Sequence, residues 1–98
     1  MMTEAELTKS IRNLLNILGI WHFKHWSGPM THPKGISDLI GIWEGKPLYI
    51  EVKTAKGRVS DHQAVFIDTV KQHGGIAFIA RSVEDVMDAL NIRDRFTK

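Results

Sequence analysis

The sequence contains no cysteine in its 98 residues. A disulfide framework and a thiolate metal site are therefore excluded, and a reducing compartment such as the cytoplasm is the expected location. No apolar run approaches the roughly 20 residues that cross a bilayer, and the first residues lack the basic and apolar regions of a signal peptide. These absences argue against a secreted disulfide-rich domain and predict a cytoplasmic protein with no membrane span.

Acidic residues are also missing from one long stretch of the chain. No Asp or Glu occurs from Leu7 through Ser37. Because the net charge of +2 is too small to indicate a nucleic-acid binder by itself, the distribution of charge has to carry that argument. The stretch is a candidate phosphate-facing surface, although scattered solvated charges explain it about equally well. Its basic and histidine residues are Lys9, Arg12, Lys24, Lys34, His22, His25 and His32.

The patterning predicts one α/β domain over residues 1–98. Apolar residues recur at helical spacing near the N-terminus, and Thr3 with Glu6 and Ser60 with Gln63 match the capping-box pattern of helix starts. The predicted order is αβββαβα, a mixed central sheet flanked by helices. We expect helices at 3–18, 60–73 and 82–90, strands at 20–26, 36–43, 48–54 and 76–81, and a loop at 27–35.

The second and third predicted strands form a hairpin. If the four residues from Glu44 to Pro47 connect them, Trp43 pairs with Leu48 and Asp38 stands opposite Lys53. We expect this hairpin near one edge of the sheet. The strand at 76–81 is almost continuously apolar, which predicts burial on both of its faces.

A group of charged residues on this hairpin indicates chemistry. Strand alternation places Glu51 and Lys53 on one face, and Asp38 lies within about one residue pair of Glu51. Two close carboxylates repel each other unless a hard cation such as Mg²⁺ lies between them, and a nearby ammonium can orient water or balance phosphate charge. On spacing alone, an exposed Glu51–Lys53 ion pair is the commoner explanation.

Motifs from this region resemble the VRR-Nuc family of PD-(D/E)XK nucleases, restriction-endonuclease-like enzymes similar to Holliday-junction resolvases. The resemblance runs from about Thr3 to Leu90; each motif is weak alone and the set is fairly specific. Ser37 departs from the proline that usually precedes the aspartate, but that residue shapes a turn and is not a ligand. The motifs are Gly35 to Ile42, the twelve residues between Asp38 and Glu51, Ile50 to Thr54, and Gly57 to Ser60 followed by Gln63.

The resemblance implies Mg²⁺-dependent hydrolysis of DNA phosphodiester bonds, with Mn²⁺ as an expected substitute. Asp38 and Glu51 would ligate the metal together with the backbone carbonyl of Val52, and Lys53 would be the catalytic lysine. Gln63 matches a family glutamine close to the active site. The capping box alone also explains a glutamine there, and the two roles are compatible.

Similar enzymes carry a glutamate three residues before the first apolar position of the first helix. Glu4 occupies that position relative to Leu7 and is the better candidate for an additional active-site acid. Glu6 is the alternative, but a capping box with Thr3 explains it more simply.

The partners implied are DNA, with branched DNA such as Holliday junctions suggested by the family, and a second copy of the chain in a homodimer. A catalytically silent DNA-binding module of the same fold and a non-enzymatic interaction domain are the alternatives. The candidate DNA-contacting residues are Lys24, His25, Ser27, Lys34, Lys56 and Arg58.

Overall fold

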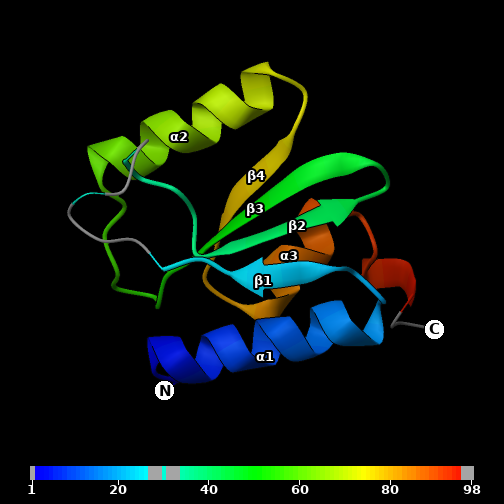
Figure 1. Ribbon diagram of the computed structural model, residues 1–98. Helices are drawn as coiled ribbons and strands as arrows, with labels where there is room; N and C mark the ends of the chain where they lie inside the picture. The colour runs from blue at the N-terminus through cyan, green and yellow to red at the C-terminus, as the bar shows by residue number, and fades with distance from the viewer. Residues whose placement is uncertain (1, 27–29, 31–33, 96–98) are drawn as a thin grey trace.

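The structure is a computed structural model that describes residues 2–26, 30 and 34–95. Its element order confirms the predicted αβββαβα arrangement, followed by a short 3-10 helix, η1 (Figure 1). Each predicted element is present, and the strands are shorter than predicted or shifted along the chain. The elements are α1 (Glu4–Ile17), β1 (His22–Lys24), β2 (Leu39–Trp43), β3 (Lys46–Val52), α2 (Asp61–Gln72), β4 (Ile76–Ala80), α3 (Val83–Ala89) and η1 (Arg93–Arg95).

The four strands form one mixed sheet in the order β1-β2-β3-β4. The first two pairings are antiparallel, and β3 pairs with β4 in parallel through the α2 crossover. The expectation that the hairpin lies near one edge was wrong, because β2 and β3 are the two central strands. The expected burial of β4 on both faces is confirmed only in part: α2 and α3 pack against it and Ala77 and Ala80 are buried, but the other three of its five residues are only partly buried.

Helices cover both faces of the sheet. Figure 1 shows α2 on one side, with α1 and α3 on the other. The main core lies on the α1 and α3 side, where Ile11 and Leu15 of α1 meet Ile50 of β3, all at 0 % exposure. On the other side, the Phe66 ring of α2 makes an edge contact with Tyr49, with ring centroids 5.0 Å apart.

The helix ends follow local chemistry that the sequence predicts. The capping boxes of Thr3 with Glu6 and of Ser60 with Gln63 are both present and satisfy backbone N–H groups that a helix start leaves unpaired. Gly19, with φ of 70°, follows α1 in the left-handed conformation that suits glycine. No helix in the described ranges is long and apolar enough to cross a membrane.

The hairpin register differs from the prediction. Trp43 pairs with Lys46 and not with Leu48, so the connection is a two-residue turn. Its residues, Glu44 and Gly45, have φ values of 50° and 80°, as a type I′ turn requires, and this turn matches the twist of paired strands. The shift is two residues, so every side chain keeps its predicted face while its cross-strand partner changes.

Pro47 lies inside β3 without disrupting it. Pairs in an antiparallel ladder alternate between hydrogen-bonded and non-hydrogen-bonded types, and Trp43–Lys46 closes the turn as a hydrogen-bonded pair. The next pair, Ile42–Pro47, is then non-hydrogen-bonded, so the nitrogen of Pro47 points away from β2. On that side, β4 pairs with β3 only from Leu48 onward, and the missing N–H costs the sheet no hydrogen bond.

Candidate active site

Asp38 and Glu51 come together at the end of the hairpin. The last printed pair of the β2–β3 ladder is Leu39 with Ile50. Continuing this register by one position places Asp38 opposite Glu51, rather than opposite Lys53 as the longer turn predicts. That position is a non-hydrogen-bonded pair, where opposing side chains approach most closely. The corrected register therefore brings the two carboxylates together more directly than the sequence argument does.

The backbone of Val52 fixes the Asp38 side chain. The Val52 N–H donates to Oδ2 of Asp38 at 3.0 Å. The next N–H, that of Lys53, points to the opposite side and donates to the Ala80 carbonyl at 3.0 Å. Because the N–H and C=O of one strand residue point to the same side, the Val52 carbonyl is directed toward the Asp38 side.

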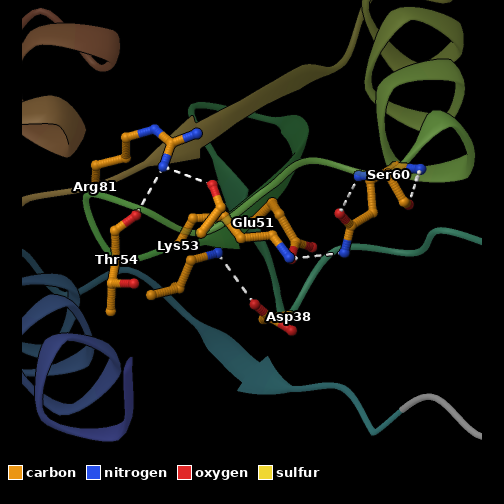
Figure 2. A network of polar contacts seen from close by, with 9 residues as sticks. Asp38, Glu51, Lys53, Thr54, Ser60 and Arg81 are labelled. Carbon is orange, nitrogen blue, oxygen red and sulfur yellow. Dashed lines mark hydrogen bonds and ion pairs between the residues drawn. The ribbon is translucent and has the colours of Figure 1, made fainter. Parts of the chain in front are cut away.

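Glu51 is buried in the site, with 2 % of its surface exposed. Its Oε2 accepts a hydrogen bond from Nε2 of Gln63 at 2.9 Å and lies 3.5 Å from Nζ of Lys53 (Figure 2). Burial, reinforced by the Asp38 carboxylate and opposed by Lys53, raises the pKa of Glu51 to about 7. Near neutral pH the site therefore carries a carboxyl group poised between its two protonation states.

Gln63 serves the helix and the site at once. Its Oε1 accepts from the Ser60 N–H at 2.9 Å in the capping box, while its Nε2 donates to Glu51. Both roles that the sequence left open are thus compatible in the structure. Gly35 sets the neighbouring loop against the same helix start: a Cβ there would lie 2.2 Å from the His62 carbonyl oxygen, so only glycine fits.

Arg81 organises the loop that follows Lys53. Its Nη1 donates to the carbonyls of Thr54 at 2.7 Å and Gly57 at 2.9 Å, and Figure 2 shows this clamp beside Lys53. Gly57 is close to the lysine side chain, because an added Cβ would lie 3.3 Å from Cδ of Lys53. The clamp therefore holds the loop that borders Lys53.

Three buried polar side-chain atoms without a hydrogen-bond partner belong to Glu51 and to residues next to Asp38 in the chain or across the sheet. Across the described ranges they are Nε2 of His25, Oγ of Ser37 and Oε1 of Glu51. Ser37 precedes Asp38 in the chain, and the backbone N–H of His25 donates to the backbone carbonyl of Asp38 at 2.7 Å. Such atoms are costly in a folded protein unless a ligand, ion or water satisfies them, and Oε1 of Glu51 lies within the site itself.

The oxygen donors of this site suit Mg²⁺ better than they suit a metal that needs three or more side-chain ligands. No group of three or more His, Cys, Asp or Glu side chains that could hold a metal is found among the residues the structure describes. Mg²⁺ is commonly bound by one or two carboxylates and keeps several waters. Asp38, Glu51 with its unpartnered Oε1, and the Val52 carbonyl supply such a set.

The predicted acids of the first helix are not equivalent. Glu6 belongs to the capping box, where its Oε1 accepts from the Thr3 N–H at 2.8 Å and hydrogen bonds from Thr3 lower its pKa. Glu4 lies in the first turn of α1 with an exposed side chain. The structure therefore accounts for Glu6 through folding, and the catalytic role of Glu4 stays a prediction.

The predicted DNA-contacting residues lie at different places. His25 borders Asp38, as described above. Lys34, Lys56 and Arg58 are exposed, and Lys24 is half-buried with its Nζ 4.6 Å from the Trp26 ring centre. Ser27 lies outside the described residues.

Sequence reasoning missed the part played by Arg81. The sequence predicts Arg81 as the last residue of a buried strand, whereas in the structure Arg81 follows β4 and its side chain reaches back to the loop after β3. The strand order could have indicated this role. Parallel neighbouring strands end at the same edge of a sheet, so a cation directly after β4 lies beside the residues that follow Glu51 in β3.

A mixed sheet with an acidic pair and a lysine at the end of its central hairpin defines a nuclease-like α/β domain. The VRR-NUC domain family matches residues 1–84, and the chain belongs to that family. This family of nuclease-like domains implies DNA as the substrate, and the suspected family is thereby confirmed. No curated protein matches the chain.

Proposed function

We propose that this protein is a Mg²⁺-dependent DNA endonuclease whose reaction takes place at Asp38, Glu51 and Lys53. The observation that carries the proposal is the buried Oε1 of Glu51, which lacks a partner beside a second carboxylate. A site that served only folding would not keep this costly arrangement. A divalent cation relieves both the repulsion and the unsatisfied oxygen.

Each residue has a distinct part in the proposed hydrolysis. Asp38, Glu51 and the Val52 carbonyl would hold the cation, which would polarise the phosphoryl oxygens and lower the pKa of the attacking water. Lys53 orients that water or balances the charge of the phosphate in the transition state. Gln63 fixes the Glu51 carboxylate through its 2.9 Å hydrogen bond, so the ligand needs little reorganisation.

The substrate in this proposal is branched DNA cut by a homodimer. The support is the resemblance to Holliday-junction resolvases and the small size of the domain. Cleavage of two opposing strands requires two sites, and a two-fold symmetric pair of chains supplies them.

The test is a cleavage assay on linear, flap and four-way DNA with Mg²⁺, Mn²⁺ or EDTA, comparing wild type with Lys53→Ala. The variant should fold and bind Mg²⁺ normally by calorimetry, yet cleave roughly 100-fold more slowly or worse, because Lys53 is not a ligand. Lys46→Ala is the matched control, since it removes an exposed lysine from the other end of β3.

The outcomes separate the three functions under consideration. Metal-dependent cleavage lost only in Lys53→Ala supports the nuclease. DNA binding without cleavage under any metal indicates a silent DNA-binding module, and the absence of both indicates an interaction domain. Near-wild-type cleavage by Lys53→Ala would reject the mechanism.

A further inference from the structure

A hollow of about 420 Å³ lies between α1 and β1, and its lining is chemically one-sided. Cations, amides and an indole border it, and no Asp or Glu is among the lining residues that the structure describes. The cationic, amide and aromatic residues of the lining are Lys9, Arg12, Asn13, Asn16, Lys24 and Trp26. Three cations around one acid-free hollow favour a polyanionic occupant.

The hollow is partly organised in advance. Nε of Arg12 donates to Nε2 of His22 at 3.2 Å, which fixes the guanidinium against β1. Lys24 stacks on Trp26 with its Nζ 4.6 Å from the ring centre, and the indole remains 78 % exposed. Lys24 therefore restrains the indole while leaving most of its surface available for a second planar group.

The hollow lies on the α1 face of the sheet, whereas Asp38 and Glu51 project toward the α2 face, and the two regions are connected around the end of the edge strand β1. Lys24 pairs with Leu39, the residue after Asp38, and the His25 N–H binds the Asp38 carbonyl at 2.7 Å. Neighbouring strands are about 4.8 Å apart, so the end of β1 lies roughly one strand spacing from the Asp38 backbone. Because β1 is an edge strand, a nucleic-acid strand with one phosphate at the carboxylates can pass around the end of β1 and place nearby nucleotides at this hollow.

We propose that the hollow holds an unpaired DNA strand next to the scissile phosphate, with phosphates on the cations and a base stacked on Trp26. The proposal rests on the nuclease function above and specifies its substrate: DNA with a single-stranded segment beside the cut. Bases inside a duplex stack on one another and do not offer a free face, whereas unpaired bases stack readily on aromatic side chains.

The experiment measures DNA binding by fluorescence anisotropy in EDTA, so that cleavage plays no part. Trp26→Ala should weaken binding of single-stranded and flap DNA by roughly 5- to 100-fold and leave blunt-duplex affinity unchanged. Trp21→Ala is the matched control. Trp21 is exposed like Trp26, at 63 %, and is also next to β1, but it does not line the hollow. Lys9→Gln should reduce the salt dependence of single-strand binding by about one unit of slope or less.

Two results would overturn the proposal: equal losses from Trp26→Ala and Trp21→Ala, or a duplex affinity that falls as far as the single-strand affinity. Thermal melting of both variants shows whether either loss reflects unfolding. The failure of this proposal and that of the nuclease are distinguishable. If the protein never cleaves DNA but loses single-strand binding only in Trp26→Ala, the DNA-binding hollow is supported and the nuclease function is rejected. If the protein cleaves DNA but Trp26→Ala binds single strands like wild type, only the hollow is rejected.

Discussion

Glu51 carries its carboxyl group in a nearly solvent-free position beside Asp38, and its pKa is about 7 in the folded chain against an ordinary value of 4.5. A raised folded-state pKa means that protonation favours folding. The metal-free protein should therefore be most stable below about pH 4.5 with respect to this group, and this contribution is lost as the pH rises through about 7.

Glu51→Gln should remove that pH dependence. We expect the variant to exceed wild type in unfolding free energy by about 1–3 kcal/mol above pH 7, with the difference shrinking toward pH 4.5. Urea unfolding in EDTA across this pH range measures it, and Asp68→Asn, which changes an exposed acid of α2, is the control. A difference that is constant with pH would contradict the assigned cause. Mg²⁺ should reverse the order, because only wild type keeps the full ligand set.

Individual site residues were predictable from the sequence to different degrees. Strand alternation puts Glu51 and Lys53 on one face whatever the register, but Asp38, Glu51 and Lys53 were predicted as a site only with the family resemblance, because spacing alone favours an exposed ion pair. The capping-box contact of Gln63 was predicted from its local N3 position, whereas its place near the active site was implied only by the family resemblance, because the contact with Glu51 spans 12 residues. Arg81 was not anticipated, since its contact spans 27 residues and depends on which strands become neighbours.

At the scale of the elements, Arg81, which follows β4, holds the loop between β3 and α2 by donating hydrogen bonds to its backbone carbonyls. Arg81→Ala should lower kcat roughly tenfold with little change in KM, because the freed loop no longer confines Lys53. Arg81→Lys should restore part of the rate by donating to one carbonyl. Arg58→Ala, an exposed arginine in the same loop, should instead raise KM.

The contrasting result for the loop is also informative. If Arg81→Ala lowers the melting temperature while kcat stays at the wild-type value, the clamp stabilises the fold and has no positioning role. Steady-state cleavage and thermal melting of the same preparations separate the two cases.

The hairpin shows why element types are easier to predict than register. Alternating apolar residues identify β2 and β3, but their pairing depends on the backbone conformation of two turn residues. Glu44 and Gly45 both take positive φ, which a glutamate rarely does, so a longer connection was the simpler expectation. Gly45 was the local signal for the shorter turn.

For the whole molecule, the proposed DNA-facing surface combines the acid-free segment from Leu7 to Ser37 with the loop at 56–58, and it extends over both sides of the sheet, because Lys24 borders α1 and Lys34 borders α2. Neutralising Lys24, Lys34, Lys56 and Arg58 together should weaken binding to all DNA sequences and lower the salt slope by about one unit per lost phosphate contact. Cleavage at saturating DNA should fall much less, because none of the four is assigned to chemistry.

Salt-dependent binding of the quadruple variant is the measurement for that surface. A control that neutralises Lys46 and Lys71, exposed lysines outside it, should keep the wild-type slope. If the quadruple variant also keeps that slope, DNA approaches by another face, even if the nuclease assignment stands.

The two-residue turn between β2 and β3 also bears on how quickly the chain folds. A hairpin closes in microseconds, whereas the parallel pairing of β3 with β4 must wait for the whole α2 crossover. Asp38 and Glu51 therefore meet early, before the surrounding layers are complete. We infer that their repulsion acts on the folding barrier as well as on the native state, and that refolding is fastest in mild acid, where one of the two carboxyl groups is neutral.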